Sequence, residues 1–261
     1  MRVAMMQGSD GLTVDGPAWE RLAALVRAAR PDLLVTNEMP FGIWLAQADT
    51  FDGVAAAASV AAHEAGLEAL RGLGVPVVLS SRPVLAGSKL ANEAFALVDG
   101  AYHPAHHKHY FPAEPGFHEA TWFHAGRPGF DTVQAGKIKA GFLLCTELFF
   151  NEWARHYRRQ GARLIAVPRT SGESVERWRM AAAMAAIVSG CYVVSSNRAG
   201  LASPELTFGG EGFALAPDGS SIAKTSADEP VVVFDLDPAR SVEQQTRWPC
   251  YVPELVIAPV A

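Results

Sequence analysis

Short apolar runs alternate with amphipathic segments along the whole chain, and this alternation constrains the fold more than any other feature of the sequence. The run Val3–Met6 precedes a segment, 17–29, that opens on a proline and carries apolar side chains on one helical face. Asp99-Gly100 and Pro217-Asp218-Gly219 each separate two extended runs and therefore predict hairpins. Hairpins mixed with strand–helix–strand connections favour an α/β fold with two mixed sheets covered by helices.

The same patterns give approximate bounds for each element. Helices are expected at 17–29, 54–73, 151–160 and 173–190, and strands at 3–6, 33–36, 75–80, 93–98, 101–107, 132–134, 137–144, 163–167, 192–196, 212–216, 220–224 and 231–235. Residues 108–130 are expected to form one long loop rich in aromatic side chains, and the tail from Pro238 to be mostly irregular. No repeat or linker divides the chain, so we expect residues 1–261 to form a single domain.

Composition excludes several classes of protein. Apolar residues make up 49% of the chain, and the net charge of −5 argues against a general nucleic-acid binder. The most apolar stretch, 180–194, is shorter than the roughly 20 residues that span a bilayer, and the first residues do not resemble a signal peptide. Cys145, Cys191 and Cys250 are odd in number and widely spaced, which indicates a reducing cytoplasm. We therefore expect a cytoplasmic protein with no nucleic-acid or membrane partner.

Three residues stand where chemistry is plausible. Cys145 ends an apolar strand before a turn into a helix, where a thiol can be exposed to substrate beside backbone N–H groups; a buried, inert thiol is the alternative. Glu38 also ends an apolar strand, where partial desolvation suits a general base. Lys108 follows the strand 101–107 and can stabilise an oxyanion. Taken singly, a residue such as Glu38 is more often a helix cap or a surface glutamate, and one such as Lys108 a solvated loop lysine.

Together with their surroundings, these residues resemble the nitrilase superfamily of carbon–nitrogen hydrolases, whose signature is a Glu-Lys-Cys triad. The blocks that carry the resemblance occur in family order and cover almost the whole chain. They are 33–40 around Glu38, 107–119 around Lys108, 141–147 around Cys145 with Glu152 and Arg155 following, and then 161–168, 196–200 and 216–219. The resemblance implies a four-layer α-β-β-α sandwich.

The resemblance also implies roles. Glu38 would take the thiol proton and later activate water, while Lys108 and the Thr146 backbone N–H would hold the oxyanion. Cys145 would attack the carbon of a small amide or N-carbamoyl compound and carry a thioester-type acyl intermediate, without a metal or an organic cofactor. Glu119 would be a second active-site glutamate that positions the lysine and the substrate, with Glu114 as a competing candidate.

Further side chains are candidates for substrate binding. Besides Thr146, they are Trp44, Arg169 and Asn197. Arg169 could bind a substrate carboxylate or pair with a neighbouring glutamate, Glu173 or Glu176, and Trp44 could line the pocket or pack in the core. The resemblance further implies a homodimer, or a larger assembly, formed through helices that include the stripe 180–188.

Other functions remain open at this stage. Nitrile-cleaving members usually carry an aromatic residue after the cysteine, where this chain has Thr146, so a nitrilase is the second choice. A catalytically silent scaffold and a metal hydrolase built on His103, His106, His107 and His109 are further alternatives.

Overall fold

Two six-stranded sheets face each other in the computed structural model, which describes residues 1–255. The first sheet has the strand order β14-β1-β2-β3-β4-β5 and the second β13-β12-β9-β8-β7-β6. In each sheet three central strands run parallel, β1-β2-β3 and β7-β8-β9, and antiparallel strands flank them. The two sheets thus share one plan, and β14, from the end of the chain, completes the first of them.

The element bounds are as follows. The strands are β1 (Arg2–Met6), β2 (Leu33–Val35), β3 (Val77–Ala86), β4 (Lys89–Val98), β5 (Ala101–His107), β6 (Val133–Ala135), β7 (Ile138–Phe142), β8 (Leu164–Arg169), β9 (Tyr192–Asn197), β10 (Ala199–Ser203), β11 (Leu206–Gly209), β12 (Phe213–Leu215), β13 (Ser221–Lys224) and β14 (Val231–Asp235). The helices are α1 (Pro17–Ala29), α2 (Gly53–Arg71), α3 (Glu119–Trp122), α4 (Asn151–Arg159), α5 (Glu176–Ser189) and α6 (Pro238–Gln245), with 3-10 turns η1 (Leu45–Gln47) and η2 (Cys145–Phe149).

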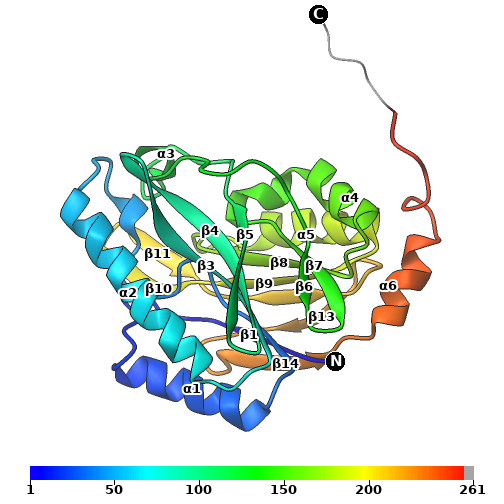
Figure 1. Ribbon diagram of the computed structural model, residues 1–261, viewed down its shortest axis with the longest axis horizontal. Helices are drawn as coiled ribbons and strands as arrows, with labels where there is room; N and C mark the ends of the chain where they lie inside the picture. Colours follow the sequence, from blue (N-terminus) through cyan, green and yellow to red (C-terminus); the bar gives the residue numbers. More distant parts are fainter. Residues whose placement is uncertain (256–261) are drawn as a thin grey trace, which may run out of the picture.

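Apolar side chains divide the molecule into layers. One cluster lies between the two sheets and draws on both, with Val35, Leu79, Phe142 and Ala166 among its members. A second cluster joins the first sheet to α1 and α2, and a third joins the second sheet to α4 and α5. Figure 1 shows the two helix pairs on opposite sides of the sheets. The predicted α-β-β-α sandwich is confirmed.

Local sequence explains where the outer helices begin. Pro17 occupies the first turn of α1, where its missing N–H costs nothing, and the Asp52 carboxylate caps α2 by accepting from the N–H groups of Val54 and Ala55. Strand β8 is buried at every position because helices cover one face of its sheet and the other sheet covers the opposite face.

The structure corrects several expectations. The tail is irregular from 246 to 255 as expected, but it opens with a helix that was not predicted, α6, which begins at Pro238 behind the Asp237 cap. Strands β3 and β4 are longer than the predicted 75–80 and 93–98, and they form a hairpin that was not predicted, turning at Gly87 with φ 63°. The long loop contains α3, and β10 and β11 form a separate two-stranded sheet that the apolar pattern did not indicate. The last six residues of the expected domain, 256–261, lie outside the described part of the chain. No helix within the described part is long and apolar enough to cross a membrane.

Candidate active site

The candidate residues gather at one end of the two sheets. Glu38 follows β2 and Cys145 follows β7, so both lie beyond the carboxyl ends of parallel strands. Lys108 follows β5, whose carboxyl end lies at the same edge because β5 runs antiparallel to β4 and β4 antiparallel to β3. Open α/β sheets place their ligand sites at this edge.

Cys145 lies in a strained turn. Its φ is 51°, in the left-handed region that non-glycine residues rarely adopt, and it is the first residue of η2. The turn is held by Glu147, whose Oε2 accepts from the Leu144 N–H at 2.8 Å. Just before it, β7 packs so closely on α4 that a Cβ at Gly141 would lie 2.4 Å from the Tyr157 ring. The Tyr157 hydroxyl donates to the Phe142 carbonyl at 2.6 Å, which fixes the end of the strand.

The Glu38 turn is held from the second sheet. The Glu38 N–H donates to the Arg169 carbonyl at 3.3 Å, and the next residue, Met39, has φ 42°. The buried guanidinium of Arg198 donates to the carbonyls of Glu38, at 3.3 Å, and Met39, and to Asp10 Oδ1 at 2.6 Å. A charged group thus ties the strained Glu38 turn to β9 and to the loop after β1.

Four candidate side chains converge. Lys108 Nζ lies 3.0 Å from Glu38 Oε1 and 2.6 Å from Glu119 Oε2. A carboxylate oxygen of each glutamate and the Cys145 sulfur lie within 4.8 Å of one another. Glu38, Lys108 and Glu119 are 0% exposed and Cys145 is 2% exposed. The sulfur lies 3.3 Å from the Thr170 carbonyl, to which the thiol donates. Glu114 is exposed, and the contacts it makes are backbone hydrogen bonds with Phe117.

The lysine and the second glutamate influence each other electrostatically. Burial disfavours the Lys108 ammonium, but the carboxylates of Glu119 and Glu38 outweigh it and raise the Lys108 pKa. Burial raises the pKa of Glu119 to about 8, although Lys108 opposes the shift. The lysine therefore stays charged, and the Glu119 carboxyl holds a proton to higher pH than an ordinary glutamate.

The thiol is held protonated at rest. Burial raises the Cys145 pKa, the Glu38 charge raises it further, and Lys108 only partly offsets both. A thiol in this environment needs a base at hand when it attacks. Oε2 of Glu38 is buried and has no hydrogen-bond partner within the described residues, which leaves it able to accept a proton, and Oε1 of Glu119 is likewise without a partner.

Sequence reasoning missed residues that brace the site. Glu147 appeared only as part of a motif, yet it also accepts from the His109 N–H at 2.8 Å and contacts His106 Nε2 at 2.8 Å. It thereby connects the Cys145 turn to the Lys108 strand. Asn92 donates to Glu38 Oε1 at 2.8 Å. The strand pattern could not reveal this contact, because alternation shows only which face of the strand a residue lies on, and every second residue lies on that face.

Two of the four substrate-binding candidates lie close to the reacting groups. Thr146 adjoins Cys145 and its hydroxyl donates to the Tyr110 carbonyl at 2.7 Å. Arg169 ends β8 beside Thr170, but its fully buried guanidinium donates to the hydroxyls of Ser195 and Ser171 and to the Glu211 carbonyl. Within residues 1–255 it makes an ion pair with neither Glu173 nor Glu176, because its donors are taken by Ser195, Ser171 and the Glu211 carbonyl.

The other two candidates bind protein groups. The Trp44 indole N–H donates to the Gly116 carbonyl at 3.0 Å, and the ring packs near Phe117 and Phe208 in a buried aromatic cluster. The Asn197 amide accepts from the Ser171 N–H at 3.0 Å and donates to the Gly210 carbonyl at 2.6 Å. Their contacts shape the loops that surround the site.

The potential metal ligands do not favour a metal ion. In the part of the chain that the structure describes, the group of three or more potential ligands is Glu38, Glu119 and Cys145. The Lys108 ammonium already lies between the two carboxylates, where a cation would lie. His106 and His107 bind different groups, because His106 contacts Glu147 and His107 contacts Glu93 at 3.0 Å, and although the His106 and His109 rings lie 5.4 Å apart, the histidines form no group of three potential ligands within the described residues.

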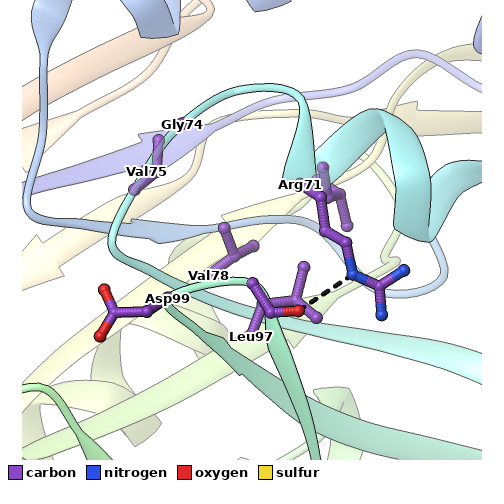
Figure 2. Close-up of a pocket in the computed structure, with 8 residues that line it drawn as sticks. Arg71, Gly74, Val75, Val78, Leu97 and Asp99 are labelled. Atoms are coloured by element: carbon purple, nitrogen blue, oxygen red, sulfur yellow. Dashed lines mark hydrogen bonds between the residues drawn. The ribbon is translucent and has the colours of Figure 1, made fainter.

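A separate pocket lies at the opposite end of the first sheet. It encloses about 270 Å³ between the end of α2 and the Asp99-Gly100 turn. The Arg71 side chain donates to the Gly100 carbonyl at 3.0 Å. Figure 2 shows Arg71 together with Val78 and Leu97, which also line the pocket. None of the four converging side chains lines it.

Fold and site together define a class: an α-β-β-α protein with a buried glutamate–lysine–cysteine constellation at the carboxyl ends of its strands. Residues 2–245 match the sequence model of the family described as carbon-nitrogen hydrolase. The chain belongs to the carbon–nitrogen hydrolase family, so the resemblance and the enzyme class predicted from sequence are confirmed.

Two of three similar proteins are described as amidases. The chain is 27% identical over 257 residues to an N-carbamoylputrescine amidase of Arabidopsis thaliana, an alignment that covers 90% of this chain and 86% of the relative. A carbon–nitrogen hydrolase of Helicobacter pylori shares the fold with a TM-score of 0.84 and 22% identity, over 96% of this chain and 94% of that one. An amidase of Nesterenkonia has a TM-score of 0.74 and 21% identity over 94% of both chains.

Proposed function

We propose that this hydrolase cleaves the C–N bond of a small amide or N-carbamoyl compound, with Cys145 as nucleophile. The observation that carries the proposal is the convergence of the sulfur with the Glu38 and Glu119 carboxylates, within 4.8 Å, around the buried Lys108 ammonium. N-carbamoyl compounds come first because the relative from Arabidopsis is an N-carbamoylputrescine amidase.

The reaction proceeds in two halves. Glu38 takes the Cys145 proton as the sulfur attacks the carbonyl carbon, and the tetrahedral oxyanion forms beside Lys108 and the Thr146 N–H. The C–N bond then breaks, the nitrogen leaves with that proton as ammonia or an amine, and a thioester remains. Water then gives a proton to Glu38, attacks the thioester and releases the acid, which regenerates the thiol. Glu119 holds the Lys108 ammonium in place throughout.

The test is ammonia release from a panel of small amides, N-carbamoyl amines, N-carbamoyl amino acids and nitriles. We expect release from an amide or carbamoyl compound by the wild type, and none by Cys145→Ala. Cys191→Ala is the matched control. Cys191 is also a buried thiol, and burial raises its pKa to about 12, but it lies at the start of β9, away from the site. Release that survives Cys145→Ala would contradict the mechanism.

The same panel separates the alternatives. A nitrilase would release ammonia from a nitrile and leave the corresponding amide intact. A silent scaffold would release none from any compound and would also fail to form a covalent adduct on Cys145. Retention of an intact lysine–carboxylate–thiol cluster supports an active enzyme over a scaffold.

We further propose self-association and a reducing environment. Large apolar side chains are exposed on α5, at Met180 and Met184, and near the end of the chain, at Val242 and Trp248. This exposure supports a homodimer, which light scattering on the purified chain would detect. Cys145, Cys191 and Cys250 are all unpaired thiols, which supports a cytoplasmic location. The match over 2–245 supports a single catalytic domain across the chain.

A further inference from the structure

We propose that Asn92 is a positioning residue. Its side-chain amide and the Lys108 ammonium both donate hydrogen bonds to Oε1 of Glu38, so the other oxygen, Oε2, is the one that accepts the proton. The inference rests on the proposed function of Glu38 as the base. It concerns a residue of β4 that none of the sequence motifs contains.

Two donors converge on one carboxylate oxygen. Asn92 Nδ2 lies 2.8 Å from Glu38 Oε1, and Lys108 Nζ lies 3.0 Å from the same atom. All three residues are 0% exposed. Oε2 of Glu38 has no partner within residues 1–255. An oxygen that already accepts two hydrogen bonds is a poor proton acceptor, so the proton goes to Oε2.

Asn92 also sets the position of the lysine. The Lys108 backbone N–H donates to the Asn92 carbonyl at 2.9 Å, so one residue aligns both members of the pair. Strand β4 pairs with β3 over its whole length and with β5 on its other side, which makes it a rigid support. The amide is oriented with Nδ2 toward Glu38, because the opposite orientation would bring two acceptors together.

Several charged or titratable groups surround the Glu38 carboxylate. Lys108 comes from the end of β5, Glu119 from α3 and Cys145 from η2, while the Arg169 and Arg198 guanidiniums approach from the second sheet. Asn92 is a neutral donor among them. Its removal therefore leaves the net charge of the site unchanged and removes one hydrogen bond to the ionised carboxylate.

Asn92→Leu is the informative variant, since leucine has the same branching and carries no donor. Asn92→Asp keeps the shape and places a second acceptor against Oε1. Phe95→Leu is the matched control, because Phe95 is a buried residue of the same strand that packs on the Tyr102 ring, with ring centroids 5.1 Å apart, outside the site. Unfolding temperatures of all three variants separate loss of stability from loss of alignment.

The kinetic experiment measures kcat and KM against pH on the best substrate of the panel. We expect Asn92→Leu to lower kcat roughly 10- to 100-fold, with KM changed less than about twofold, because alignment of a general base acts on the transition state. In Asn92→Leu the acidic limb of kcat/KM should move to higher pH, because the ionised carboxylate loses a hydrogen-bond donor. In Asn92→Asp it should move further, because the added like charge also disfavours the ionised carboxylate. Phe95→Leu should keep the wild-type limb.

A second readout needs no turnover. Infrared difference spectra between wild type and Glu38→Gln identify the protonated Glu38 carboxyl band as the pH falls, and its midpoint should rise in Asn92→Leu. A midpoint and a pH limb that stay at the wild-type values would overturn the proposal and make Asn92 merely structural. Absence of turnover by the wild type would instead contradict the proposed function, and the infrared midpoint would still decide the role of Asn92.

Discussion

Lys108 and Glu119 are in direct contact and closed off from solvent, with 2.6 Å between Nζ and Oε2. Burial raises the pKa of Glu119 to about 8 in spite of that contact, so folding favours the protonated carboxyl. The free energy of unfolding therefore falls as pH rises, whereas an ordinary paired glutamate makes it rise with pH.

The first prediction concerns this dependence. A carboxyl whose pKa rises on folding stabilises the native state fully below its unfolded pKa of 4.5, and the stabilisation is lost as pH rises toward 8. The free energy of unfolding of the wild type, relative to Glu119→Gln, should fall between pH 5 and pH 8 by up to about 1.4 kcal/mol per pH unit. Urea unfolding at a series of pH values measures it. A difference that is constant across this range would contradict the prediction.

Glu147 gives a second prediction. Its carboxylate accepts from the N–H groups of Leu144 and His109, and glutamine would turn an NH₂ group toward one of these donors. Glu147→Gln should lower the unfolding free energy by about 2 kcal/mol and reduce kcat, because the Cys145 turn loses a support. Chemical denaturation and steady-state kinetics measure the two effects. Glu152→Gln, a change on the α4 surface, is the control and should alter neither.

A third prediction concerns the close approach of β7 and α4. Gly141→Ala places a Cβ 2.4 Å from the Tyr157 ring, which the rigid ring cannot accommodate without moving, so we expect a loss of about 1–3 kcal/mol. Gly53→Ala is the matched control: the added Cβ meets no atom within 4 Å, and the residue lies in α2. The control should be neutral or stabilising by roughly 0.5–1 kcal/mol. Equal losses in both variants would show that packing at Gly141 is not the cause.

The sequence was a good guide where local pattern decides the outcome. Apolar periodicity indicated most strands and the four long helices, and the strand ends located Glu38, Lys108 and Cys145. The Asp237-Pro238 start of α6 was present in the sequence but lay in a tail that otherwise lacked periodicity. The contacts of Arg198 with the Glu38 turn and of Asn92 with Glu38 Oε1 join residues 160 and 54 positions apart, so only the tertiary fold reveals them.

A fourth prediction concerns Arg198. Its guanidinium spreads donors over Asp10 and the carbonyls of Glu38, Met39 and Gly42, an arrangement that a lysine ammonium cannot reproduce. Arg198→Lys should therefore destabilise the protein by about 2 kcal/mol and lower kcat more than it raises KM, since the base is misplaced. Arg240→Lys, at an exposed position of α6, is the control. Unchanged kcat with unchanged stability would show that the Glu38 turn keeps its conformation without the Arg198 hydrogen bonds.

The last prediction separates the charge of Glu38 from its role as a base. Burial, followed by the Glu38 charge, raises the Cys145 pKa, while Lys108 lowers it. Glu38→Gln removes the negative charge and keeps the lysine, so the thiol should ionise at lower pH than in the wild type. We expect the apparent pKa for alkylation of Cys145 by iodoacetamide to fall, while hydrolysis of the best amide drops by roughly 10²–10⁴-fold for want of a base. Mass spectrometry of the labelled peptide follows the first quantity and ammonia release the second. If alkylation in Glu38→Gln needed a higher pH than in the wild type, the carboxylate would not be the charge that holds the thiol protonated.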